Sequence, residues 1–333
     1  MLPRRTWGPI AALSLLTAAC QATVAPSNGP SGMVWVEGGW LQMGSDRIEA
    51  LPEERPSHAV KVSGFWIDRT EVTNAQFAAF VEATGYRTTA ELPVPAEVFT
   101  SQLEPGAPPP SAEDLQPGST VFVFPTQEEV GHWEWVHGAD WRHPEGPGSS
   151  IAERMDHPVV QVSCQDAEAY ARWADKQLPS EAQWEWAARG GLLDAPYSWG
   201  EASPDSEPAL LNKWQGSFPV FNTQRDGFLA SAPVGQFPPN GYGLSDMSGN
   251  VWEWCADGWN ARLYQTRAGE RPQTDPVNPP EPTAASAFRS LRGGSFLCSD
   301  DYCTRYRVSA RTGTTADSAT NHIGFRCVRF ARD

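Results

Sequence analysis

Short apolar segments separated by polar turns dominate the first part of the chain. Met33–Val36 and residues 59–62 each predict a strand, and the apolar segment Phe65–Asp68 follows the second of them. Residues 41–43 are expected to continue the first strand beyond the glycines at 38–39. This pattern predicts short strands joined by turns.

A helix is expected to start directly after these strands. Thr73 is placed as an N-cap, and Gln76 three residues later completes a capping box. Phe77 and Phe80 then fall on one face of the helix.

The clearest helical periodicity begins at Ser163. Apolar residues recur at i, i+3, i+4 and i+7 from Ala167 to Ala174, which predicts one apolar face. Residues 178–180 end this helix and cap a second one over residues 181–189. Beyond the second helix the pattern predicts only loops and short strands.

The composition favours an irregular fold. The 333 residues include 15 Trp, 29 Gly and 30 Pro, which predicts glycine- and proline-made turns around a core of stacked indole rings. A proline-rich stretch over residues 92–120 predicts a long surface excursion. No repeat recurs at a fixed period, which argues against solenoids and propellers.

The net charge of −15 at pH 7 limits the class of partner. Nucleic acid is not expected, because phosphate contacts need a basic surface. Bound divalent cations or a cationic peptide are compatible with this charge, and so is a simple solvated acidic surface.

The N-terminus has the features of an export signal. Arg4 and Arg5 precede an apolar stretch over residues 7–19 that is too short to span a bilayer. Residues 16–20 resemble a bacterial lipobox, so Cys20 is expected to be lipidated after removal of a signal peptide over residues 1–20. Ordinary signal cleavage nearby is the alternative.

These features predict an exported lipoprotein that faces the periplasm or the exterior. Only the lipid anchor would attach it to the membrane, and residues 21–32 would form a flexible tether.

Cys298 and Cys303 are separated by four residues, which suits neither a zinc knuckle nor a thioredoxin-like turn. A short loop of this length can bring two sulfurs together as a disulfide, or as ligands of a soft ion such as Cu(I). In an exported protein the spacing alone favours the disulfide. With Cys20 lipidated, five cysteines remain, so at least one thiol stays unpaired.

Six stretches spread over residues 33–329 make the chain resemble the formylglycine-generating enzyme (sulfatase-modifying factor) family. They are residues 64–68 with 71–74, 141–146, 178–185, 238–244, 249–254 and 324–327. Cys298 and Cys303 fall where the active members of that family have two active-site cysteines, and Tyr302, Arg305, Tyr306 and Arg311 follow as in that family.

The resemblance implies one domain over residues 33–331 with an α+β fold. This fold is irregular, loop-rich and similar to a C-type lectin, with little regular secondary structure. The implied activity is a copper-dependent oxidase that converts a cysteine in an unfolded or nascent sulfatase, within a Cys-x-Pro-x-Arg-type segment, to Cα-formylglycine. O2 and a thiol reductant would be consumed, and a monomer is expected.

The resemblance also implies roles for individual residues. Cys298 and Cys303 would hold Cu(I), and Ser295 would shape the oxygen or substrate pocket. Alternatively, Ser295 supplies only a turn hydroxyl bonded to the backbone. An exposed pair of this kind would form a disulfide when copper is absent.

Two calcium sites are implied, each of which would fix a loop. The ligands of the first are Asn212, Lys213, Asp226 and Phe228, and those of the second are Asp246, Gly249, Val251 and Glu253. Lys213, Phe228, Gly249 and Val251 would contribute only backbone carbonyls. The alternative is that Asp226 starts a turn with Gly227 and that Glu253 only forms hydrogen bonds.

Substrate is expected in a groove near Trp141, Ser149 and Arg311, although such tryptophans are more often core residues. Animal members of the family have disulfides at positions that correspond here to Ala171 with Cys327 and to Ala188 with Val308, so these bridges are absent. Two further cysteines, Cys164 and Cys255, could pair with each other or with Cys327.

Two other functions fit the same fold. A non-catalytic cell-surface binding module would not need the cysteine pair. An iron-dependent sulfoxide synthase would need a histidine-rich site, whereas the chain has only 6 His and no His-x-x-x-His-like cluster.

Overall fold

The computed structural model describes residues 29–101, 108–280 and 287–330. The predicted signal peptide, Cys20 and most of the predicted tether lie outside these ranges. Residues 29–32, which belong to that tether, pack on the domain instead: the Arg69 N–H donates to the Gly32 carbonyl at 3.0 Å.

The strands are short and form several small sheets. β1, β4 and β13 form one antiparallel sheet; β11, β10, β9 and β12 form another; three hairpins pair β2 with β3, β5 with β6, and β7 with β8. Their bounds are β1 Met33–Val36, β2 Gly39–Met43, β3 His58–Val62, β4 Phe65–Asp68, β5 Gly118–Val123, β6 His132–His137, β7 Gly216–Ser217, β8 Phe221–Asn222, β9 Trp252–Gly258, β10 Phe288–Arg292, β11 Arg311–Thr315, β12 Ile323–Gly324 and β13 Val328–Phe330.

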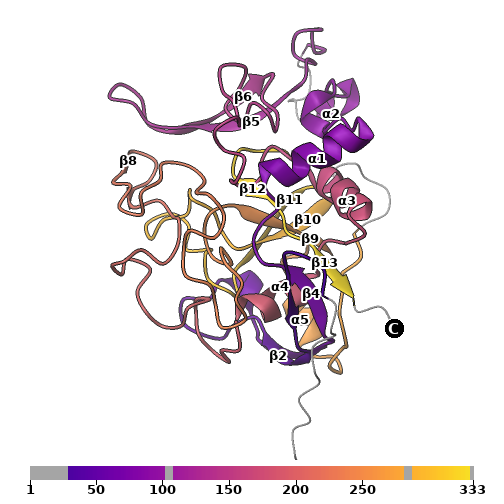
Figure 1. Ribbon diagram of the computed structural model, residues 1–333, viewed down its shortest axis with the longest axis vertical. Coiled ribbons are helices and arrows are strands. Elements are labelled where there is room, and N and C mark those ends of the chain that lie inside the picture. Colours follow the sequence, from indigo (N-terminus) through magenta and orange to yellow (C-terminus); the bar gives the residue numbers. More distant parts are fainter. Residues whose placement is uncertain (1–28, 102–107, 281–286, 331–333) are drawn as a thin grey trace, which may run out of the picture.

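The helices are equally short. Figure 1 shows α1, α2 and α3 grouped near the β5–β6 hairpin, while α4 and α5 lie beside β4 and long coil segments fill the opposite side. No helix within the described ranges is both long and apolar enough to cross a membrane. The helices are α1 Asn74–Thr84, α2 Ala96–Ser101, α3 Cys164–Trp173, α4 Glu181–Ala188 and α5 Leu263–Arg267. The irregular, loop-rich α+β fold is therefore confirmed.

Local signals predicted the three longest helices correctly. Thr73, Ser163 and Ser180 each cap a helix by accepting a backbone N–H three residues later. In contrast, residues 41–43 do not continue β1, because they belong to β2 and pair with β3. The short helices α2 and α5 were not predicted, since neither is long enough to display an apolar face.

Buried ion pairs fix the irregular interior. Arg311 binds Glu181, Arg292 binds Glu185 at 2.5 Å, and Arg326 binds Glu253 at 2.7 Å, with all six side chains almost completely buried. The Glu residues of two of these pairs lie on α4, and this helix packs against β2, β3, β9 and β10. Because a buried charge without its partner is strongly destabilising, these pairs determine how the loops around α4 are placed.

Candidate active site

The cysteine pair lies on the long loop that joins the neighbouring antiparallel strands β10 and β11. Gly293 and Gly294 open this loop with φ values of +96° and +75°. A Cβ on Gly294 would lie 2.9 Å from the backbone nitrogen of Tyr306. Glycine is therefore needed here both for its left-handed backbone and for the close approach of the returning chain.

Two backbone hydrogen bonds fold the loop on itself. The Cys298 N–H donates to the Ser295 carbonyl, and the Cys303 N–H donates to the Ser299 carbonyl, both at 2.9 Å. The Sγ atoms of Cys298 and Cys303 lie 2.8 Å apart as free thiols. The spacing of four residues thus brings the two sulfurs together as predicted.

The two thiols differ in their ionisation. A hydrogen bond from Cys298 lowers the pKa of Cys303 to about 7; burial opposes this shift, and the backbone and charge of Arg305 assist it. Burial and the adjacent Cys303 raise the pKa of Cys298 well above its usual range. Near neutral pH, Cys303 is therefore a partly formed thiolate and Cys298 keeps its proton.

Both cysteines line a pocket of about 290 Å³. Its walls are largely aromatic: Trp133 and His322 lie 4.9 Å apart by ring centroid, and Phe218 stacks on Tyr302 at 4.4 Å. Burial lowers the pKa of His322 to about 3, so this imidazole is neutral. The complete lining is Trp133, Phe218, Trp252, Ser295, Leu297, Cys298, Tyr302, Cys303, Arg305, Thr312 and His322.

Ser295 lines this pocket and is fully buried. Its Oγ accepts the Leu297 N–H at 3.2 Å, as expected for a turn hydroxyl. The residue therefore supports the turn beneath the sulfurs and also borders the pocket.

The three predicted substrate residues do not line the pocket. Trp141 is 2% exposed and packs edge-on against Phe77 in the core, which corrects its placement in a groove. Arg311 is fully buried and bound to Glu181, so its side chain lies outside this pocket. Ser149 donates to the Gly146 carbonyl at 2.7 Å within a turn.

Sequence reasoning missed most of the pocket walls. Trp133 lies on β6 and Trp252 on β9, Phe218 precedes β8, and His322 precedes β12. These residues come from segments far apart in the chain. The only local signal was that Trp252 stands inside one of the stretches that resemble the family.

The sulfur pair is compatible with a soft metal ion. Its separation of 2.8 Å exceeds a disulfide bond of about 2.05 Å, and the Cys303 side chain is only half-buried. The described residues contain no group of three or more His, Cys, Asp or Glu that could hold a metal. Two sulfurs without further ligands suit Cu(I), which needs few donors and prefers sulfur.

The residues of the first predicted calcium site lie close together. The carboxylate of Asp226 accepts the N–H groups of Lys213 and Phe228, each at 3.1 Å. Burial raises the pKa of Asp226. The buried Oδ1 of Asn212 has no hydrogen-bond partner among the described residues. An unpartnered amide oxygen and a buried carboxylate are both ligand types that a hard cation accepts.

The second predicted site contains an excess of carboxylates. Arg326 pairs with Glu253 and lies 3.9 Å from Glu71. Burial raises the pKa of Glu71, and the nearby charge of Asp246 raises it further. The Oε2 of Glu71 has no hydrogen-bond partner within the described structure. These three buried carboxylates share the guanidinium of Arg326, and within the described structure they are not arranged as a metal site. Glu71 was missed, although it stands in one of the family-like stretches.

Cys164, Cys255 and Cys327 are buried free thiols. None of them is bonded to another cysteine, so no pairing among these three is found. Burial raises the pKa of each above its usual range, which makes all three poor nucleophiles.

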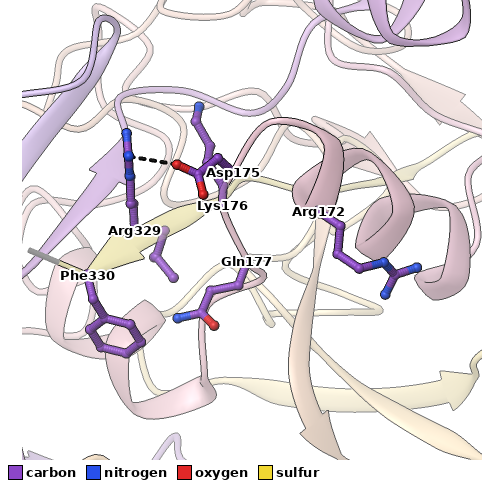
Figure 2. Close-up of a pocket in the computed structure, with 7 residues that line it drawn as sticks. Arg172, Asp175, Lys176, Gln177, Arg329 and Phe330 are labelled. Carbon is purple, nitrogen blue, oxygen red and sulfur yellow. Dashed lines mark hydrogen bonds and ion pairs between the residues drawn. The ribbon is translucent and has the colours of Figure 1, made fainter. Parts of the chain in front are cut away.

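A second hollow, of about 380 Å³, lies beside β13 and shares no residue with the cysteine pocket. Figure 2 shows its charged lining, in which Arg329 binds Asp175 at 2.7 Å. Lys176 binds Asp68, and Arg172 lies 3.7 Å from Glu168. Because these cations are already paired with carboxylates, this hollow has none of the reactive chemistry of the cysteine pocket.

Known structures support the fold. PvdO from Pseudomonas aeruginosa matches with a TM-score of 0.61 and 23% identity, covering 90% of this chain and 94% of that one. CarF matches with a TM-score of 0.52 and 19% identity, covering 91% and 99%.

Sequence relatives are more similar. The formylglycine-generating enzyme of Thermomonospora curvata is 49% identical over 91% of this chain and 95% of its own length. That of Mycobacterium tuberculosis is 47% identical over 89% and 97%. The inactive C-alpha-formylglycine-generating enzyme 2 of Bos taurus is 39% identical over 89% and 87%.

The family model of the sulfatase-modifying factor enzyme 1-like domain matches residues 20–331. This match covers the whole of the described structure, including the loop with the cysteine pair. The chain therefore belongs to the sulfatase-modifying factor enzyme family.

Proposed function

We propose that this enzyme converts a cysteine of an unfolded sulfatase, within a Cys-x-Pro-x-Arg-type segment, to Cα-formylglycine. The main support is the contact between Cys298 and Cys303 at the wall of an open pocket. Family membership does not decide the activity, because an inactive relative is 39% identical. A binding module gives no reason for two adjacent thiols with divergent pKa values, and we therefore favour the oxidase.

The electron balance requires both O2 and a thiol. Conversion of the substrate Cβ–SH to an aldehyde with release of hydrogen sulfide removes two electrons. Two molecules of thiol reductant supply two more as they form a disulfide, and one O2 accepts all four. One oxygen atom enters the aldehyde and the other leaves as water.

In this proposal, Cys298 and Cys303 hold Cu(I), which supplies activation of O2 next to the substrate Cβ–H. The depressed pKa of Cys303 makes a thiolate ligand available at neutral pH. Trp133, Trp252 and Tyr302 provide apolar walls that exclude water and enclose the substrate side chain.

We further propose Ca2+ at two sites. The first would be formed by the side chains of Asn212 and Asp226 and the carbonyls of Lys213 and Phe228. The second would be formed by the side chains of Asp246 and Glu253 and the carbonyls of Gly249 and Val251, with Glu71 nearby. These ions would stabilise loops rather than take part in the reaction.

We also propose export and lipid attachment at Cys20, which lies outside the described residues. Under this proposal the enzyme acts as a monomer on sulfatase chains before they fold. It would meet them outside the cytoplasm.

The test is conversion of a Cys-x-Pro-x-Arg peptide by the purified protein loaded with Cu(I), in air and with a thiol reductant. The expected product is an aldehyde peptide seen by mass spectrometry. Cys298→Ala and Cys303→Ala should each abolish conversion. Cys164→Ala, which removes a buried thiol outside the pocket, should retain it.

An unmodified peptide in the presence of stoichiometrically bound copper would refute this substrate. Full conversion by Cys303→Ala would refute the role of the cysteine pair.

A further inference from the structure

Lys213 has a buried side chain with a charged environment of its own. The residue is 2% exposed, and its Nζ lies 3.0 Å from Asp300 Oδ1 and 3.1 Å from Asp205 Oδ1. The ammonium also lies 5.6 Å from the centre of the Tyr306 ring. A calcium role of the kind expected from the sequence would use only the backbone carbonyl of Lys213 and gives no reason for a lysine.

Two of the groups around this side chain, Asp300 and Tyr306, belong to the active-site loop. Asp300 lies between the two cysteines in sequence and also accepts a hydrogen bond from the hydroxyl of Tyr306. The next residue after Lys213 holds the same loop through its backbone, because the Trp214 N–H donates to the Cys298 carbonyl at 2.9 Å. Two consecutive residues therefore attach the start and the middle of the Cys298–Cys303 turn.

We propose that Lys213 is a positioning residue for the cysteine pair. By binding Asp300, and through it Tyr306, the lysine fixes the turn against the Lys213–Trp214 segment and keeps the two sulfurs adjacent. This inference concerns the site of the proposed function, but it makes a statement about the thiols that can be tested without any substrate.

A charge-assisted hydrogen bond from a buried ammonium is strong enough for this role. Such bonds are stronger than bonds between neutral groups, and removal of the ammonium leaves the carboxylate poorly compensated. Without Lys213, Asp300 would lose the ammonium but keep the neutral Tyr306 hydroxyl, and it would turn towards solvent, since its side chain is already 49% exposed. The turn would then hold its two sulfurs together for a smaller fraction of the time.

The experiment measures the disulfide equilibrium of the metal-free protein in a glutathione redox buffer. Two protein thiols react with oxidised glutathione to give the Cys298–Cys303 disulfide and two reduced glutathione molecules, so the equilibrium constant reports how closely the sulfurs are held. Lys213→Met is expected to lower this constant by about tenfold, which corresponds to about 1.4 kcal/mol.

The control is Lys176→Met, which removes a partly buried lysine that binds Asp68 at 2.6 Å, and Asp68 lies on β4 rather than on the active-site loop. Its equilibrium constant should match the wild type within about twofold. Asp300→Asn provides a second variant with a half-exposed side chain and should also lower the constant, while Lys213→Met/Asp300→Asn should add little to either single change.

A Lys213→Met protein with a lowered melting temperature but an unchanged disulfide constant would overturn the inference, since the lysine would then serve only overall stability. Should that variant fail to fold, an unchanged constant in Asp300→Asn would overturn it equally. Because no peptide is oxidised in this measurement, its result is separate from that of the proposed function.

Discussion

At the scale of single residues, the two active-site cysteines have opposite properties although their sulfurs touch. Both line the pocket, but Cys298 is only 1% exposed whereas Cys303 is half-buried. Donation of a hydrogen bond by the buried thiol stabilises the thiolate of its partner, which explains why one pKa falls while the other rises. Cys303 is therefore the member of the pair that reacts first with an electrophile.

This asymmetry predicts the pH dependence of alkylation. In the metal-free, reduced protein, the rate at which iodoacetamide modifies Cys303 should rise through a midpoint near pH 7, because the thiolate forms as the pH passes the pKa of about 7. Cys298→Ala removes the hydrogen bond and should move the midpoint upward, towards the ordinary value of about 8.5. Peptide mass mapping at each pH measures the rate, and an identical midpoint in both proteins would contradict the explanation.

The buried ion pair between Arg311 and Glu181 should make stability sensitive to a single substitution. Arg311→Met should destabilise the protein by about 3–5 kcal/mol, because it leaves Glu181 charged and buried without its main partner. Chemical denaturation measures this loss. Arg329→Met breaks the exposed pair with Asp175 and should cost at most about 1 kcal/mol. A stable Arg311→Met protein with a raised KM for peptide would instead restore Arg311 as a substrate residue.

At the scale of elements, the sequence predicted features that depend on residues close together in the chain. It missed features that depend on residues far apart in the chain. The caps at Thr73, Ser163 and Ser180 and the turn between the cysteines depend on contacts over three to five residues. The Arg311–Glu181 pair spans 130 positions. Burial of Arg311 could not be read from the neighbouring residues, and the same is true of the separate segments that wall the pocket.

In the loop between β10 and β11, Gly294 lies directly against the backbone of Tyr306, which leaves no room for a side chain. Gly294→Ala should destabilise the protein by about 1–3 kcal/mol, because the residue has a φ of +75° and its Cβ would press on Tyr306. It should also reduce the fraction of disulfide formed in a fixed redox buffer. Gly148→Ala, whose Cβ would meet nothing within 4 Å, is the matched control and should change neither quantity. Wild-type disulfide content in Gly294→Ala would show that the loop tolerates the side chain.

At the scale of the whole molecule, a fold with such short strands has few ladder hydrogen bonds to hold its loops. Buried ion pairs around α4 replace part of that support. The clusters at Asn212 and Glu71 each contain a buried oxygen without a hydrogen-bond partner in the described structure. A cation at these places would connect loops that otherwise meet only through polar contacts.

Calcium should therefore raise the melting temperature of protein that has first been treated with a chelator. At a free concentration 100-fold above the dissociation constant, binding to the folded state adds about 2.7 kcal/mol per site. Mg2+ at the same concentration should have a smaller effect, because it demands a tighter octahedral shell. Asp226→Asn should remove part of the calcium-dependent shift in a thermal scan. An equal melting temperature with and without calcium would argue against both sites.

The burial of Cys164, Cys255 and Cys327 has a consequence for the conditions under which the enzyme can work. None of these thiols is bonded to another cysteine, so within the described structure no covalent crosslink can be lost to a reducing agent. In the proposed reaction, reductant would be consumed at the same place where Cys298 and Cys303 could form a disulfide. The scaffold would thus tolerate any thiol concentration that keeps this pair reduced, because burial keeps the other three described thiols out of redox chemistry.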